Sequence, residues 1–414
     1  MVNYTGWQYL LIDIANQFGL DKLLFEERIQ WATDNLHQLE ALADQAETKP
    51  LYVSAVLAIR KAQKGIPTGH MVGLDACCSG IQVMSALTGC VAGSRSTGMV
   101  DPNVRADAYG LTTKVMSDIL GNAVNVSRGD AKLALMTSFY GSKAKPKEIF
   151  GEDTPELNAF YQAAQIIAPG AWELLQDLLA SWQPYALEHS WKMPDGYDVR
   201  VKVMTKKEAR IEVDELDHAS FTYEFYENAG SKKGLSNVAN VTHSVDAWVL
   251  RAMHRRCNYD RRHIEYVSEC LEAELNTRRL FGQPENPEEF LDQKVAYYLE
   301  QYRRSTLADA VILPHLDQAT VTCLSQEHLE AIHKMVQGML QYQPFELVTV
   351  HDEFKAHPNN LNWVRWQYKE IMAEIAESNV LDDLLSQLHG TPGSFNKLSF
   401  NLPEQIRESE YALS

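Results

Sequence analysis

Long apolar runs are missing from the 414-residue sequence, and so are the signals of secretion. No stretch approaches the 18 consecutive apolar residues of a membrane-spanning helix, so we expect no membrane span. The N-terminus lacks the basic start and the small-residue cleavage site of a signal peptide. The sequence also has no internal repeat and no low-complexity tract, which argues against a repeat protein.

Cysteines are few and follow no metal-binding or disulfide pattern. They form no C-x-x-C pair and show no zinc spacing. We therefore expect free thiols in a reducing cytoplasm. The six are Cys77, Cys78, Cys90, Cys257, Cys270 and Cys323.

Positive charge is also in deficit, because 38 Lys and Arg face 55 Asp and Glu, a net charge of −17. This balance argues against a protein that coats nucleic acid through a general basic surface, although net charge does not describe the local field. Three basic clusters remain, each more typical of a solvated face than of a binding site: Lys143, Lys145 and Lys147; Lys202, Lys206 and Lys207; Arg255, Arg256, Arg261 and Arg262.

The residues that are present predict a large α+β protein. A hydrophobic content of 45% is enough for a large core or for two to three packed subdomains. Apolar residues at helical spacing predict helices over residues 7–62, and residues 103–190 and 245–340 are also mostly helical in pattern. "FGQPENPEE", residues 281–289, breaks the last helical stretch. Alternating residues after the turn "MPDGYDV" predict one long hairpin at about 200–236.

Two aspartates follow short strand-like runs. "LVTVHDEF" predicts a buried strand over residues 347–350 that leads into His351 and Asp352, and "HMVGLDACCSG" predicts a strand that ends at Asp75. Aspartate is common where strands simply turn. If the fold brings the two together, however, they suit a pair of Mg²⁺ ions for phosphoryl or nucleotidyl transfer.

The segment "SRGDAKLALMTSFYGSK", residues 127–143, predicts a helix with an anion site at its start. Ser127 and Asp130 form a capping box, and glycine follows Tyr140 at the helix end. Arg128 and Lys132 lie one turn apart, about 6 Å along the axis. They are spaced like the phosphates of a triphosphate, near free backbone N–H groups. A surface helix with two cations is the alternative interpretation.

These motifs together resemble the phage and mitochondrial single-subunit RNA polymerases. The R-x-x-x-K helix ending in Tyr-Gly is similar to that family's fingers helix, while "LDACCSGIQ" and "VHDEF" are similar to its two palm motifs. Further similar segments follow in the same order: "FGLDKLLFEERIQW", "ADAYGLTTKVM", "MPDGYDV", "NVTHSVDAWVLR" and the C-terminal "LSFNLPEQIRESEYALS". The resemblance implies a right-hand polymerase palm and fingers that transfer nucleotides from NTPs on a DNA template.

The resemblance also implies roles for individual residues. Asp75 and Asp352 would hold two Mg²⁺ ions, with the Ala76 carbonyl as an extra ligand. Arg128, Lys132 and Lys22 would bind the triphosphate, and Lys132 would stabilise or protonate the leaving pyrophosphate. The remaining nucleotide-pocket residues implied by the family are Tyr140, which reads the ribose, Tyr109, Gly80 and His351.

Several positions depart from the family pattern or bear on the choice of sugar. Glu353 replaces a serine and adds negative charge, Ala76 replaces a glycine, and Leu133 replaces a second basic residue. Val249 stands where the family often has a histidine that senses the ribose. Related DNA polymerases carry a glutamate that blocks the 2′-OH at the position of Gly80, so the glycine favours ribonucleotides.

The resemblance implies a division of the chain and several partners. The family's preceding half is expected from a smaller partner subunit that supplies the thumb and N-terminal part, as in split two-subunit phage enzymes. DNA template, RNA product, NTPs and a separate DNA-melting or recruiting protein complete the expected partners, in the cytoplasm of an infected bacterial cell. A family A-like DNA polymerase fragment and a non-catalytic assembly or regulatory subunit are the alternatives.

The expected parts are palm 1–91, fingers 92–248 with the helix 128–140, and palm 249–414 with a helical insertion at about 255–325 and a C-terminal foot-like segment 395–414.

Overall fold

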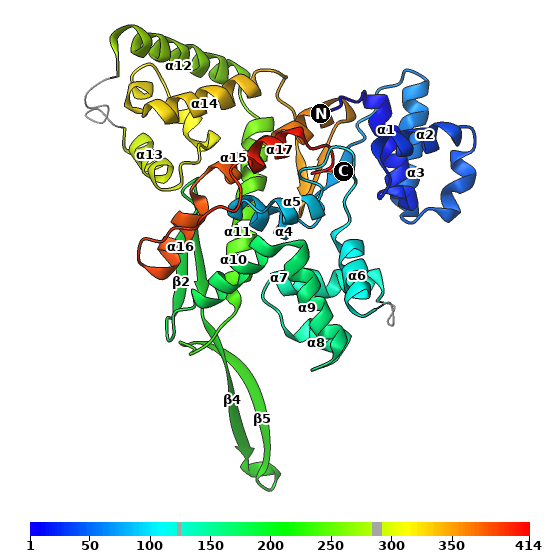
Figure 1. The fold of residues 1–414 in the computed structure, drawn as a ribbon, viewed down its shortest axis with the longest axis vertical. Helices are drawn as coiled ribbons and strands as arrows, with labels where there is room; N and C mark the ends of the chain where they lie inside the picture. The colour runs from blue at the N-terminus through cyan, green and yellow to red at the C-terminus, as the bar shows by residue number, and fades with distance from the viewer. Residues whose placement is uncertain (122–125, 284–291) are drawn as a thin grey trace.

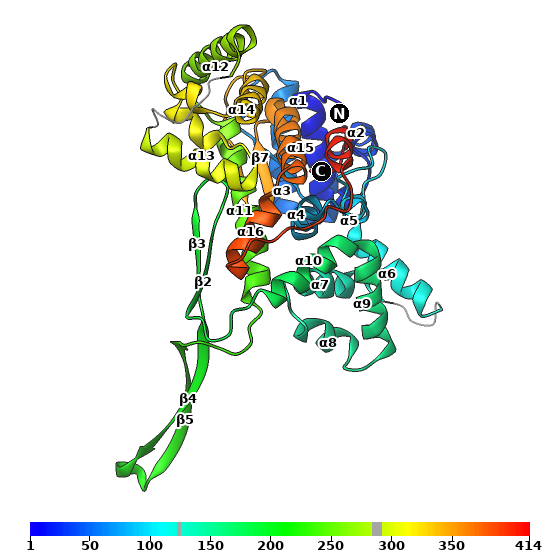
Figure 2. The same ribbon diagram turned by 60° about the vertical axis from the view of Figure 1, so that its left-hand side comes forward.

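The computed structural model describes residues 1–121, 126–283 and 292–414. The chain is mostly helical with three small antiparallel sheets, which confirms the α+β class (Figures 1 and 2). No helix within these ranges is long and apolar enough to cross a bilayer. All six cysteines are free, as expected.

The first helices form a unit at one side of the molecule (Figure 1). They are α1 (Gly6–Ala15), α2 (Phe25–Asp34) and α3 (Lys49–Gln63). A π-helical turn, Asn16–Leu20, leads from α1 into the loop that carries Lys22. The buried Arg28 holds this loop, because its guanidinium donates to the carbonyls of Leu23 and Asp21 at 2.9 and 2.8 Å. The predicted helical stretch is confirmed.

A three-stranded sheet in the order β1–β7–β6 lies at the centre. It consists of β1 (Val72–Asp75), β6 (Val348–Val350) and β7 (Glu353–Ala356). Val72, Leu74 and Phe354 point into the core, where the Phe354 ring meets Tyr368 edge to face at 5.5 Å. Below the sheet pack α4 (Ser79–Thr88), α11 (Ser236–Cys257) and α15 (Leu361–Glu377).

The strand predicted at 347–350 is present, but the prediction that it is buried was wrong. Strand β6 is an edge strand, and Val348 and Val350 are 44% and 49% exposed. Only Leu347, just before the strand, is buried. Three apolar residues in a short run do not distinguish a central strand from an edge strand, because β-branched residues are common in both.

A second helical group packs beside the sheet and positions the predicted anion-binding helix. It comprises α5 (Val91–Ser96), α6 (Ala108–Ile119), α7 (Arg128–Phe139), α8 (Ala144–Phe150), α9 (Pro155–Ile167) and α10 (Pro169–Ala180). Helix α7 begins as predicted, because the Ser127 side chain accepts a hydrogen bond from the Asp130 backbone N–H at 3.0 Å. Gly141, with φ of 89°, follows the helix end.

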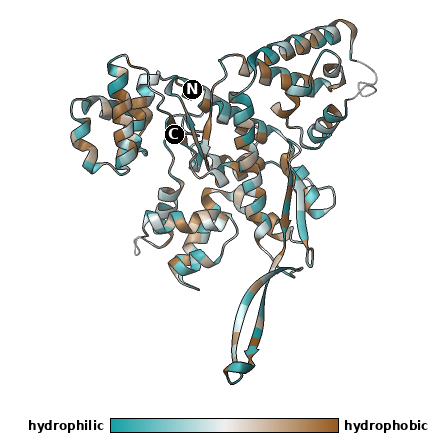
Figure 3. Cartoon of the chain, turned by 180° about the vertical axis from the view of Figure 1, so that it is seen from behind, coloured by the Kyte–Doolittle hydropathy of each residue, from teal (hydrophilic) through white to brown (hydrophobic). Residues whose placement is uncertain are grey.

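The long hairpin predicted at about 200–236 is confirmed, and a shorter hairpin that was not predicted precedes it. Strands β2 (Glu188–Lys192) and β3 (Asp198–Lys202) pair across the turn at Asp195, and β4 (Met204–Val213) pairs with β5 (Ala219–Asn228). The second hairpin projects away from the body, and its tip is hydrophilic (Figures 1 and 3). The shorter hairpin was missed because the turn "MPDGYDV" joins β2 to β3 and does not merely precede the long hairpin.

The expected helical insertion is a subdomain with its own apolar core. This core extends to Met339, beyond the expected end at 325, and draws on α12 (Arg261–Phe281), α13 (Gln293–Ser305) and α14 (Gln326–Met339). The break predicted at 281–289 lies largely outside the described residues. Arg255 fastens the subdomain to the body by bridging Asp195 at 2.9 Å and Asp309 at 3.1 Å.

The C-terminal segment returns to the central sheet. After α16 (Val380–His389) and α17 (Leu402–Glu408), the chain pairs Leu413 with Ala76, just past β1. The buried Arg365 fixes this return, because it donates to the Glu410 carboxylate at 2.5 Å and to the Tyr9 hydroxyl at 3.1 Å. Both chain ends consequently lie near the sheet (Figure 1).

Candidate active site

A single cleft of about 1050 Å³ opens between the central sheet, the first helical unit and α7. Every site residue predicted from the sequence lines it: Lys22, Asp75, Ala76, Gly80, Tyr109, Arg128, Lys132, Tyr140, His351 and Asp352. These residues come from five separate parts of the chain, so the fold brings together residues that lie as much as 330 positions apart in the sequence.

The two aspartates meet at adjacent strand ends. Asp75 is the last residue of β1, and Asp352 lies with His351 in the two-residue turn between β6 and β7. The Ala76 backbone N–H donates to the Asp352 carbonyl at 3.3 Å, which ties the two strand ends together. His351 adopts a left-handed backbone, with φ of 55°, as a tight two-residue hairpin requires.

Negative charge accumulates around Asp75. Burial, with the charges of Asp352 and Glu353, raises the pKa of Asp75 to about 6. Within the described ranges neither Asp75 nor Asp352 has a salt bridge. The carboxylates therefore repel one another, and the charge of Arg105, which also lines the cleft, offsets this repulsion only in part.

Asp246 is a further carboxylate of the cleft that the sequence analysis did not single out. It projects from α11 and accepts a hydrogen bond from the Ser79 hydroxyl at 3.4 Å. Burial and the charge of Asp352 raise the pKa of Asp246 to about 7. Its motif, "NVTHSVDAWVLR", was available as a signal, but helical periodicity alone did not tell which face of α11 meets the cleft.

The predicted triphosphate residues on α7 are present but already paired. Arg128 makes a forked ion pair with Asp107, at 2.7 Å from Nε and 2.9 Å from Nη2. Although burial opposes it, this pair lowers the pKa of Asp107. The Arg128 guanidinium and the Lys132 ammonium both lie over the Tyr109 ring, at 5.4 and 5.7 Å from its centroid.

Lys22 likewise lines the cleft as part of an ion pair with its neighbour Asp21. Both side chains are partly exposed, at 47% and 38%. Such a pair contributes little to stability, so the lysine is available to an anion at small cost.

Tyr140 is held from several sides. Its ring stacks on His243 of α11, with centroids 4.6 Å apart and planes 9° from parallel. A Cβ at Gly80 would lie 3.0 Å from the Tyr140 hydroxyl oxygen, so the glycine leaves room for this ring. Val249, at the position where the family often has a histidine, is buried, and the imidazole next to Tyr140 is that of His243, which the sequence analysis did not single out.

The donor set of the cleft fits a hard divalent cation. Carboxylate oxygens and backbone carbonyls are the ligands that Mg²⁺ prefers, and burial with the charges of Asp352 and Glu353 raises the pKa of Asp75. Asp75 and Asp352, with the Ala76 carbonyl beside them, are the residues that would hold such ions.

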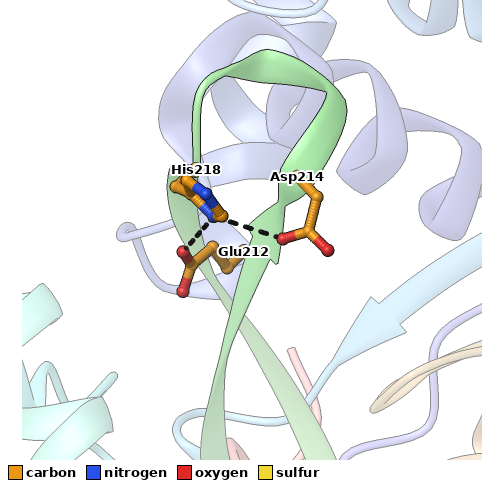
Figure 4. A group of neighbouring side chains, drawn as sticks. All are labelled: Glu212, Asp214 and His218. Carbon is orange, nitrogen blue, oxygen red and sulfur yellow. Dashed lines mark ion pairs between the residues drawn. The ribbon is translucent and has the colours of Figure 1, made fainter.

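A different group of potential ligands lies far from the cleft, at the tip of the β4–β5 hairpin (Figure 4). His218 Nδ1 is 2.9 Å from Glu212 Oε1 and 3.3 Å from Asp214 Oδ1. All three side chains are exposed, so we interpret the group as a surface ion-pair cluster.

Comparison with known proteins relates part of the chain to polymerases. Residues 1–145 match the family described as DNA-dependent RNA polymerase. Over this segment the chain is similar to the DNA-dependent RNA polymerases of the phage and mitochondrial type. The matched polymerase segment contains Asp75, Arg128, Lys132 and Tyr140, whereas Asp352 lies outside it.

Two curated polymerases are similar to the chain. The DNA-directed RNA polymerase of Pseudomonas phage phiKMV is 25% identical over 34% of this chain and 21% of its own length. A probable DNA-directed RNA polymerase of Neurospora crassa is 26% identical over 34% of this chain and 18% of its own length. The chain thus spans about a fifth of the length of the curated polymerases that it matches.

The raised pKa of Asp246 generates a prediction about stability. A carboxyl whose folded pKa lies above its unfolded value of 3.8 stabilises the fold at low pH, and this contribution is lost as pH rises through about 7. Asn cannot ionise, so Asp246→Asn should not lose stability in this way. As pH rises from 4 to 8, the free energy of unfolding of the variant should therefore increase by on the order of 3 kcal/mol relative to that of wild type. Urea unfolding without divalent cations measures this, with the exposed Asp118→Asn as control. Parallel pH profiles for wild type and Asp246→Asn would contradict it.

Proposed function

We propose that this chain is the catalytic polypeptide of a DNA-directed RNA polymerase. The observation that carries the proposal is the meeting of Asp352, from outside the matched family segment, with Asp75, Arg128, Lys132 and Tyr140 in one cleft. In the proposed reaction the 3′ oxygen of the RNA attacks the α-phosphorus of an NTP. The new P–O bond forms as the bond to the β-phosphate oxygen breaks, and pyrophosphate leaves with the electron pair.

Asp75 and Asp352 would hold the metal ions in this proposal, with Ala76 supplying its carbonyl oxygen. Two Mg²⁺ ions bound there would stabilise the negative charge that develops on the attacking and leaving oxygens. Neither aspartate forms a salt bridge within the described ranges, and the charge of Arg105 does not prevent the pKa of Asp75 from being raised, which supports this role. His351, in the same turn, would line the site beside them.

Arg128, Lys132 and Lys22 would bind the triphosphate. Arg128 is held in a fork by Asp107, so the incoming phosphates would share or displace that carboxylate. Lys132 carries no such ion pair within the described ranges and would stabilise or protonate the leaving pyrophosphate. Tyr109, beneath both cations, would set their positions.

Tyr140 would pack against the incoming nucleotide and read its 2′-OH. The space above Gly80 supports a ribonucleotide, because a glutamate there would occupy the volume next to the Tyr140 hydroxyl. A site that hydrogen-bonds a hydroxyl discriminates against the analogue that lacks it far better than an apolar pocket does. His243, stacked on Tyr140, would fix the orientation of the phenol.

The fold supports a division into palm and fingers. We propose that residues 1–91 and 249–414 form the palm, with its C-terminal foot-like segment at 395–414, and that residues 92–248 form the fingers. The three-stranded sheet that carries both aspartates supports the first assignment, and α7 beside the cleft supports the second.

A smaller subunit that supplies a thumb is the proposed partner. Exposed apolar side chains on and after α3 support a protein contact, since Leu51, Leu57 and Ile66 are 47%, 59% and 50% exposed. The phage relative supports action in an infected bacterial cell. DNA template, RNA product and NTPs follow from the proposed activity.

The metal-binding role predicts the effect of removing one carboxylate charge. Asp75→Asn or Asp352→Asn should lower nucleotide addition roughly a thousandfold or more, which corresponds to about 4 kcal/mol in the barrier. Folding should persist, because removing a repelled carboxylate relieves rather than creates strain. Primer extension on a DNA template with the purified complex, beside Asp118→Asn as control, provides the measurement. Near-normal extension by either variant would remove the proposed function.

The proposed reading of the sugar predicts a selective defect. Tyr140→Phe keeps the ring stacked on His243 and removes one hydroxyl, so discrimination between NTP and dNTP should fall by roughly 1–3 kcal/mol. The ratio of kcat/KM for the two substrates measures it. Tyr161→Phe, outside the cleft, is the matched control. An unchanged ratio would mean that Tyr140 does not read the ribose.

The charge of the β4–β5 hairpin predicts template preference. Residues 211–223 at its tip contain no Lys or Arg, while Glu212, Asp214, Glu215 and Asp217 lie there. Attraction to DNA phosphates is therefore weak at this projection. We expect poor initiation on intact duplex promoters, good activity on single-stranded or pre-melted templates, and dependence on a separate melting or recruiting protein. Run-off transcription on duplex, bubble and single-stranded versions of one template tests this, and strong promoter-specific transcription from linear duplex by this chain alone would refute it.

A further inference from the structure

The face of the central sheet that lines the cleft carries a third carboxylate, Glu353. Along β7 the buried Phe354 and Ala356 alternate with Glu353 and Lys355, which face the cleft side. Glu353 is the direct cross-strand partner of Asp75. In an antiparallel pair such partners project from the same face, and two like charges placed there destabilise the sheet.

Gly73 provides the space in which the Glu353 side chain lies. A Cβ built on Gly73 would stand 2.0 Å from Glu353 Oε1 and 2.8 Å from its Cδ. The carboxylate therefore lies directly over the β1 backbone, two residues before Asp75. Any side chain at position 73 would displace it, and both residues line the cleft.

Few neighbouring charges compensate Glu353. Its carboxylate meets Lys355 at 3.1 Å, and both side chains are about one quarter exposed. Three carboxylates, those of Asp75, Asp352 and Glu353, thus lie at this end of the sheet, opposed by Lys355 and by the charge of Arg105 on Asp75. A cation bound among these acids would be attracted by each carboxylate. This attraction would outweigh the repulsion between the carboxylates.

We propose that Glu353, seated on Gly73, is part of the divalent-cation site and strengthens the hold on an ion at Asp75 and Asp352. This inference rests on the proposed function. Within the described residues the three carboxylates do not form a group with all ligand oxygens within 4.8 Å. Glu353 therefore acts through its charge and through hydrogen bonds to water bound on the ion, which Mg²⁺ retains readily.

Binding of Mn²⁺ to the purified chain without nucleotide, followed by electron paramagnetic resonance, tests the proposal independently of activity. Glu353→Gln should raise the Mn²⁺ Kd roughly tenfold, the usual effect of losing a group that supports a metal's ligands. Gly73→Ala leaves every charge in place but displaces the Glu353 carboxylate, so it should raise the Kd about threefold or more. Glu346→Gln, an exposed residue outside the cleft, is the control and should leave the Kd unchanged.

A second measurement separates this role from a structural one. Without a divalent cation, Glu353→Gln should raise the urea midpoint of unfolding, because it relieves repulsion from Asp75. An unchanged Kd in both variants, or a lower midpoint with an unchanged Kd, would overturn the inference and leave Glu353 as the partner of Lys355 only. Asp75→Asn distinguishes the two levels: if it also leaves Mn²⁺ binding intact, the proposed cation site itself fails.

Discussion

Mutual repulsion among carboxylates is the constraint on which the cleft depends. Asp75 and Asp352 stand at neighbouring strand ends, Asp246 approaches from α11, and burial and mutual charge raise the pKa values of Asp75 and Asp246. An enzyme fold tolerates such a cluster only if the surrounding core fixes it. The buried Phe354–Tyr368 contact and the return of the C-terminal segment to Ala76 provide that support.

The cations of the cleft are arranged in the opposite way. Arg128 and Lys22 each lie near its rim with an acidic partner, Asp107 and Asp21. Neither pair is deeply buried, so exchange of the carboxylate for a phosphate changes the free energy little. The cleft therefore has two kinds of charge. The carboxylates of Asp75, Asp352 and Asp246 favour a bound cation, and the cations Arg128 and Lys22 can exchange their carboxylate partners for phosphate. This arrangement suits a metal-bound triphosphate.

The sequence predicted the residues of the candidate site more accurately than it predicted the packing of strands and helices. All ten predicted site residues line one cleft, because short motifs such as "SRGDAK" and "VHDEF" fix local caps and turns that do not depend on distant contacts. Burial of β6, the shorter hairpin of β2 and β3 and the position of Asp246 could not be predicted, since each depends on which element packs against which. Arg256 shows the same limit: within a run typical of a solvated face, it is fully buried against Glu374.

The position of Tyr140 shows why the matched family segment is insufficient by itself. The residue lies at the end of α7, inside the match, but its ring is oriented by His243, which lies a hundred residues further along the chain. The space that it occupies depends on Gly80, at the start of α4. A side chain at position 80 would meet the Tyr140 hydroxyl, and loss of His243 would remove the ring on which Tyr140 stacks. The surroundings of Tyr140 are thus formed by the packed α4–α7–α11 interface, and they include residues beyond 240 that lie outside the matched segment 1–145.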